Sequence, residues 1–101
     1  MAWVLDLDGV VRLGPQVVPG AAEAVAALRA AGEPLAFVTN NSSHTRGEVL
    51  AELAAFGIEA GDEEVLTSAT AVASLVAPGQ RVLACAGPGV VEALADRGAV
   101  V

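Results

Sequence analysis

The stretch WVLDLDGVVRLG, residues 3–14, decides the fold because it leads an apolar run into two carboxylates, Asp6 and Asp8. In a strand over residues 2–7, successive side chains point to opposite faces, so both carboxylates share one face at the carboxyl end of the strand. Gly9 follows them and favours a turn. Ligand sites in open parallel sheets lie beyond the carboxyl ends of the strands, so this stretch also predicts where a site would lie.

Short apolar runs and amphipathic segments alternate along the rest of the chain. We expect helices at about 20–31, 45–56, 67–76 and 88–97, and strands at 34–41, 81–87 and 99–101. Thr45 with Glu48 three residues later matches a capping box, and Gly32 and Gly57 stand where helices end. Strands that alternate with helices of full crossover length predict an α/β fold, a Rossmann-like parallel sheet with flanking helices.

Composition narrows the classes of function. The 101 residues carry twelve acids against five basic residues, a formal net charge of −7, which disfavours nucleic acid as a partner. No apolar run approaches the roughly 20 residues of a membrane-spanning helix, so we expect no membrane partner. The N-terminus has no basic region typical of a secretory signal, and the single cysteine excludes an internal disulfide, so we expect a cytoplasmic protein.

The second apolar run, PLAFVTNN, also ends in polar side chains. Two carboxylates in one apolar pocket repel each other, and a hard divalent cation such as Mg²⁺ between Asp6 and Asp8 would resolve this. The hydroxyl and amide groups of TNNSS, residues 39–43, suit a phosphate, together with the N-terminal end of the helix that follows. The two strand ends therefore indicate phosphoryl transfer.

The segment DLDGV at 6–10 together with FVTNNSS at 37–43 resembles the first two motifs of the haloacid dehalogenase (HAD) superfamily of phosphohydrolases. VPG at 18–20 and EEVLTSATAVASL at 63–75 are similar to the branch that contains p-nitrophenylphosphatase-like and nucleotide or sugar phosphatases. In that branch a large α/β cap follows the second motif. The resemblance implies that residues 1–79 are the N-terminal part of an incomplete HAD-like core and that residues 80–101 begin the cap.

The resemblance also implies roles for four residues and a flap. Asp6 would be the nucleophile that becomes an aspartyl phosphate, and Asp8 would be the acid and base. The Asp6 side chain and the backbone carbonyl of Asp8 would hold Mg²⁺. Thr39 would bind phosphate through its hydroxyl and Asn40 would add a donor. Residues 10–18 would form a small hairpin flap beside a site for a small phosphorylated metabolite.

The chain departs from the family in one respect. The family needs a lysine from a third motif and acids from a fourth, yet all five basic residues are arginine, and residues 62–64 (DEE) look like a solvated loop. We therefore expect an N-terminal portion of a longer phosphatase, with little or no activity alone. The alternative is a non-catalytic Mg²⁺ or phosphate-binding module, or an assembly piece completed by another chain. A homo-oligomer is also open.

Other polar residues have simpler interpretations. TNNSS alone would be a polar loop that caps the next helix, and Asn41, Ser42 and Ser43 keep that interpretation. His44 is expected to be exposed and without a role. Cys85 lies in an apolar run and is expected in the core, and Arg29 is expected to face water.

Overall fold

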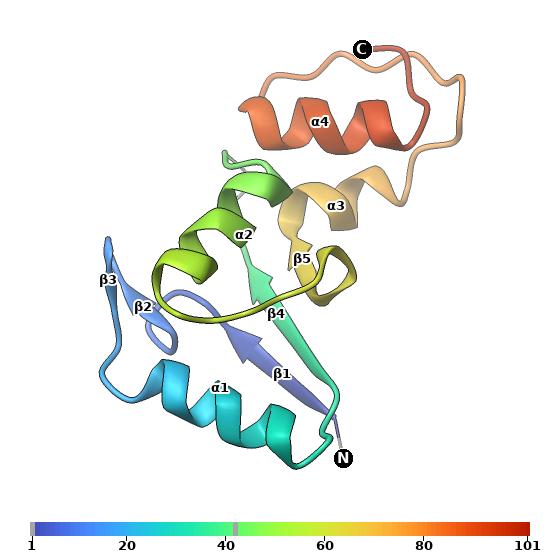
Figure 1. Ribbon diagram of the computed structural model, residues 1–101. Coiled ribbons are helices and arrows are strands. Elements are labelled where there is room, and N and C mark those ends of the chain that lie inside the picture. The colour runs from blue at the N-terminus through green and yellow to red at the C-terminus, as the bar shows by residue number, and fades with distance from the viewer. Residues whose placement is uncertain (1, 42) are drawn as a thin grey trace.

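The computed structural model describes residues 2–41 and 43–101. Figure 1 shows strands and helices alternating along the chain. The elements, in chain order, are β1 (Trp3–Asp6), β2 (Arg12–Leu13), β3 (Gln16–Val17), α1 (Ala21–Ala30), β4 (Leu35–Thr39), α2 (Arg46–Ala55), the short 3-10 helix η1 (Asp62–Glu64), β5 (Val65–Thr67), α3 (Ser68–Ala73) and α4 (Pro88–Asp96). The predicted α/β fold is confirmed.

The central sheet has the order β1-β4-β5 and both pairings are parallel. Phe37 of β4 lies opposite Leu5 of β1 and Val65 of β5, and this row faces the main hydrophobic core. Helices α1 and α2 cover that face, because both contribute buried side chains to the same core. On the opposite face Val4 and Leu66 are 68% and 50% exposed. The sheet is therefore covered on one face within the described residues.

The strand β1 ends earlier than the pattern predicts, at Asp6. The carbonyl of Leu7 accepts hydrogen bonds from the backbone N–H groups of Val11 (3.1 Å) and Arg12 (2.9 Å), which turns the chain back on itself. Strands β2 and β3 follow and pair antiparallel, with Arg12 opposite Val17. A hairpin within the predicted range 10–18 is confirmed, and its role as a flap stays a prediction.

The helix ends follow their local signals. Thr45 caps α2, with its side chain accepting from the backbone N–H of Glu48 in a capping box. Gly57 has a φ of +81°, and it ends α2 by donating to the carbonyl of Ala54 while Ile58 donates to that of Leu53. This pair of bonds satisfies the last carbonyls of the helix, and the left-handed conformation it needs favours glycine.

The C-terminal segment differs from the prediction. Helix α4 packs against α3 through a second core of Ala69, Ala73, Ala93 and Leu94. The expected strands at 81–87 and 99–101 are wrong: they reduce to one isolated bridge between Arg81 and Val100. Neither segment pairs with a strand of the central sheet, so neither has a neighbouring strand along which a longer ladder could form. Cys85 is accordingly exposed and not in the core.

Helix α3 also ends early, at Ala73, and residues 74–76 continue as turns. The expected boundary between residues 79 and 80 lies on the loop that joins α3 to α4 (Figure 1) and stays a prediction.

Candidate active site

The two carboxylates follow each other at the carboxyl end of β1. The backbone N–H of Asp8 donates to Oδ1 of Asp6 at 3.3 Å, so the turn after the strand holds the two residues together. Gly9, with a φ of +86°, continues the turn and its N–H donates to the carbonyl of Arg12 at 2.8 Å. Both acidic residues are exposed. They stand at the strand end that the sequence predicts.

The carboxyl end of β4 meets this turn. The hydroxyl of Thr39 donates to Oδ2 of Asp8 at 3.0 Å and accepts from the backbone N–H of Asn41 at 3.1 Å. Thr39 is only 5% exposed, and its hydroxyl lies between the end of β4 and the turn after β1. The structure thus brings Asp8 and Thr39, which are 31 residues apart, into direct contact.

A cavity of roughly 370 Å³ lies at the carboxyl ends of the three strands. Its polar lining comes from all three strand ends, and Val38, Leu66 and Ala71 add an apolar part. The polar residues that line it are Asp6, Thr39, Asn40, Thr67 and Ser68. Asp8 lies beside this cavity through its bond to Thr39. Three of the four predicted site residues therefore share one cavity, and the fourth is bonded to one of them.

Thr67 and Ser68 were not singled out as site residues from the sequence. Their signals were a place in the segment at 63–75 that resembles the phosphatase branch and a place at the start of a helix. The structure bears out the helix start for Thr67, whose hydroxyl accepts from the backbone N–H of Thr70 at 3.1 Å. The hydroxyl of Ser68 donates to the carbonyl of Asn40 at 3.0 Å, which ties the end of β4 to the start of α3.

Arg12 is a third residue at the site that was not singled out from the sequence. It is 6% exposed, its Nε donates to Oδ1 of Asp8 at 3.1 Å, and its Nη1 forms an ion pair with Glu52 of α2. Burial alone would lower the pKa of the guanidinium, but hydrogen bonds to Glu52 and Asp8 outweigh it, so the pKa of Arg12 is raised. Its spacing of four residues from Asp8 was the available signal.

Comparison with known proteins now identifies the family. The sequence profile of the haloacid dehalogenase-like hydrolases matches residues 3–100. The chain belongs to this HAD-like family. The expected resemblance is confirmed, and the α/β fold agrees with it.

Several relatives of this HAD-like chain are phosphatases. The acid sugar phosphatase of Staphylococcus aureus is 37% identical over 103 residues, which are 99% of this chain and 40% of the relative. The structure of a p-nitrophenyl phosphatase from Archaeoglobus fulgidus matches with a TM-score of 0.91 at 31% identity, over 98% of this chain and 39% of that one. A glycerol phosphate phosphatase from Mycobacterium tuberculosis in complex with magnesium matches at 36% identity and a TM-score of 0.81, over 97% and 31%. The chain spans about 40% of the length of the curated relative.

The donors available to a metal ion in this HAD-like chain are few. Within residues 2–41 and 43–101, no group of three or more His, Cys, Asp or Glu side chains is placed to hold a metal. Arg12 and Thr39 take one oxygen each of the Asp8 carboxylate, which leaves the Asp6 carboxylate and backbone carbonyls as donors. Such hard oxygens fit Mg²⁺, which keeps several waters when it has few protein ligands.

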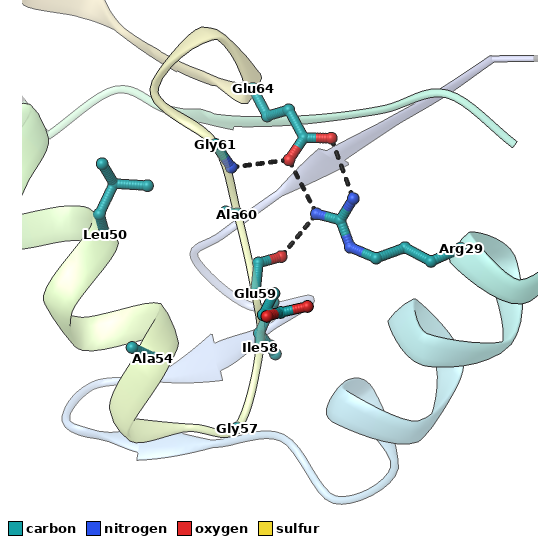
Figure 2. Close-up of a pocket in the computed structure, with 9 residues that line it drawn as sticks. All are labelled: Arg29, Leu50, Ala54, Gly57, Ile58, Glu59, Ala60, Gly61 and Glu64. Carbon is teal, nitrogen blue, oxygen red and sulfur yellow. Dashed lines mark hydrogen bonds and ion pairs between the residues drawn. The ribbon is translucent and has the colours of Figure 1, made fainter. Parts of the chain in front are cut away.

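A larger cavity, of roughly 630 Å³, lies next to the amino end of β5. Figure 2 shows Arg29 reaching from α1 to its rim, where the guanidinium donates to both carboxylate oxygens of Glu64 (3.1 and 2.8 Å) and to the carbonyl of Glu59. The hydrogen bond to Glu64 raises the pKa of Arg29, and the same bond lowers the pKa of Glu64. Arg29 and Glu64 are therefore partly buried and ion-paired rather than freely solvated, whereas Asp62 and Glu63 are exposed, as expected.

The remaining polar residues after β4 act in the loop. Oδ1 of Asn41 accepts from the backbone N–H (3.0 Å) and the hydroxyl (2.6 Å) of Ser43. His44 is exposed, with Nδ1 3.3 Å from Glu48. Ser42 lies outside the described residues. In the described part of this HAD-like chain no helix is long and apolar enough to cross a membrane.

Proposed function

We propose that the protein containing this chain is a Mg²⁺-dependent phosphatase that hydrolyses small phosphomonoesters through an aspartyl phosphate on Asp6. One observation carries the proposal: Asp6, Thr39 and Asn40 line a single cavity, and Asp8 is bonded to Thr39 beside it. The relatives are named as phosphatases of sugar phosphate, p-nitrophenyl phosphate and glycerol phosphate, and these names support the substrate class.

The chemistry follows from the positions of the two carboxylates. Asp6 attacks phosphorus, the bond between phosphorus and the ester oxygen breaks, and Asp8 gives its proton to the leaving oxygen. Asp8 then takes a proton from water, which attacks the aspartyl phosphate and releases phosphate. The Asp6 carboxylate and the Asp8 carbonyl would hold Mg²⁺, which would neutralise part of the charge on the phosphate.

Thr39 is placed to respond to the substrate. Its buried hydroxyl donates to Asp8 in this structure, and a phosphate in the cavity would compete for that donor. If the hydroxyl turns to phosphate, Oδ2 of Asp8 loses its partner and becomes available for proton exchange. Asn40 is exposed at the same cavity and would add a donor to the phosphate.

The absence of lysine favours a second function for the chain alone. A phosphate site normally gains a cation besides the metal, and Arg12, the arginine beside the proposed site, is already paired with the carboxylates of Asp8 and Glu52. A Mg²⁺ or phosphate-binding module completed by another chain would need no further cation of its own. Separate assays of the 101-residue chain and of the full-length protein distinguish the two functions.

Hydrolysis of p-nitrophenyl phosphate tests the main proposal in the full-length protein. We expect wild-type activity that EDTA removes and Mg²⁺ restores, and a loss of about 10³-fold or more in Asp6→Asn, because the nucleophile is gone. Asp62→Asn, which removes an equal charge from the exposed turn η1, is the matched control and should keep wild-type activity. Equal rates for Asp6→Asn and wild type would reject the nucleophile.

A further inference from the structure

Arg12 is a buried cation beside the proposed acid and base. Desolvation of a charged side chain costs several kcal/mol unless partners compensate for it. Here two carboxylates do so, Asp8 from the turn after β1 and Glu52 from α2. The guanidinium thus links the turn after β1, the root of the hairpin and a helix of the core.

The carboxylate of Asp8 is fixed at both oxygens. Oδ1 accepts from Nε of Arg12 at 3.1 Å, and Oδ2 accepts from the hydroxyl of Thr39 at 3.0 Å. The two donors come from different strands, so together they set the plane of the carboxylate. Thr39 lines the cavity and Arg12 does not, so Oδ2 is the oxygen on the cavity side.

We infer that Arg12 is a positioning residue, which anchors Oδ1 of Asp8 so that Oδ2 is the oxygen presented to the leaving group. This inference rests on the proposed function. When a phosphate draws the hydroxyl of Thr39 away, the bond from Arg12 remains and prevents the carboxylate from rotating. Without Arg12 the same event leaves Asp8 with no side-chain partner to orient it.

An arginine suits this position for geometric reasons. Its guanidinium presents several N–H donors in one rigid plane, so Nε can hold Asp8 while Nη1 holds Glu52. The backbone of Arg12 is fixed as well, because its N–H donates to the carbonyl of Leu7 at 2.9 Å and its carbonyl accepts from Gly9. A lysine would keep the charge but not the fixed direction of both bonds.

The test compares two leaving groups in the full-length protein. Glycerol alkoxide needs a proton to leave, whereas p-nitrophenolate leaves with little help, so loss of a well-placed acid acts mainly on glycerol phosphate. We expect Arg12→Gln to lower kcat/KM about 10-fold or more for glycerol phosphate and about 2-fold or less for p-nitrophenyl phosphate. Arg29→Gln, which removes an equal charge at the other end of the sheet, should leave the ratio of the two values unchanged.

A double-mutant cycle shows whether Arg12 acts through Asp8. In an Asp8→Asn background, Arg12→Gln should change the residual kcat/KM for glycerol phosphate by less than about 2-fold, against about 10-fold or more in the wild-type background, since the group it orients is already altered. Circular dichroism and the thermal midpoint report folding. If Arg12→Gln does not fold, Arg12→Lys is tested in its place. It should again lower kcat/KM more for glycerol phosphate than for p-nitrophenyl phosphate, by a smaller factor.

The outcomes separate the two proposals. A wild-type protein without phosphatase activity, or with full activity in Asp6→Asn, overturns the proposed function and this inference with it. An active wild type in which Arg12→Gln affects both substrates equally, affects neither, or speeds glycerol phosphate hydrolysis overturns the positioning role alone.

Discussion

Two arginines, Arg12 and Arg29, are ion-paired in the structure, and only Arg29 was expected to face water. Arg12 joins Asp8 to Glu52 beside the site, and Arg29 joins α1 to Glu64 at the other end of the sheet. Both tie a loop to a helix, and each guanidinium meets more than one acceptor. In a chain with twelve acids, these pairs neutralise carboxylates at the points where loops return to the core.

The Arg29–Glu64 pair predicts a pH-dependent stability. The pKa of Glu64 is lowered in the folded protein from 4.5, so the pair stabilises the fold above that value and loses its effect as the pH falls through the lower folded pKa. We expect Glu64→Gln to lower the free energy of unfolding by about 1 kcal/mol at pH 7, because the pair is partly exposed.

Denaturant unfolding at pH 7 and at pH 3 measures the free energy of unfolding of wild type and Glu64→Gln. Glu63→Gln, which removes the same charge from the exposed neighbouring residue, is the control. The difference between wild type and Glu64→Gln should shrink at pH 3. A difference that is larger at pH 3 than at pH 7 would contradict the assigned pair.

At the scale of the elements, two glycines at opposite ends of α2 differ in the backbone conformation that they adopt. Gly57, just beyond the helix, has a φ of +81°, whereas Gly47 in the first turn has helical geometry and room for a methyl group. A side chain at a left-handed position costs about 1–2 kcal/mol, and glycine within a helix costs about 0.5–1 kcal/mol relative to alanine.

We therefore expect opposite effects from the same chemical change. Gly57→Ala should lower the free energy of unfolding by about 1 kcal/mol, and Gly47→Ala should raise it by up to about 0.5 kcal/mol. Thermal and denaturant unfolding measure both. Destabilisation of equal size by the two variants would mean that the end of α2 does not depend on the left-handed glycine.

Sequence patterns predicted those elements whose ends carry local signals. The hydroxyls of Thr45 and Thr67 cap the N-terminal ends of α2 and α3, and α1 ends just before Gly32. Residues close in the chain therefore determine these boundaries. The strand expected at 81–87 was wrong because a strand depends on a partner strand, and within the described residues the only β-bridge of this segment joins Arg81 to Val100. The prediction that Cys85 is buried was wrong for the same reason.

The candidate site was predicted in part. Asp6, Asp8, Thr39 and Asn40 follow from polar residues at the ends of apolar runs, and parallel strands bring such ends together. Arg12 was not predicted, because its role depends on Glu52, forty residues further along the chain, and no local pattern reports that contact.

On the scale of the whole molecule, the apolar side chains buried among residues 2–41 and 43–101 form two separate cores. The main core lies between the sheet and helices α1 and α2, and the second joins α3 to α4. Leu53 in the first and Leu94 in the second are each 2% exposed, and the two cores share no residue.

This separation predicts additive effects. Leu53→Ala and Leu94→Ala should each lower the free energy of unfolding by about 2–5 kcal/mol, and the double variant should match their sum within about 0.5 kcal/mol. Denaturant titration of the three variants provides the values. A coupling above about 1 kcal/mol would show that the two cores act as one.

The exposed cysteine of the segment before α4 also offers a way to observe the molecule. Cys85 is the single thiol of this chain and Trp3, at the start of β1, is its single indole. A fluorescent acceptor attached to Cys85 would receive energy from Trp3 with an efficiency that depends on the distance between them. The chain therefore carries a donor on the sheet and an attachment point on the α4 segment, and any movement of that segment on phosphate binding becomes an optical signal without a single substitution.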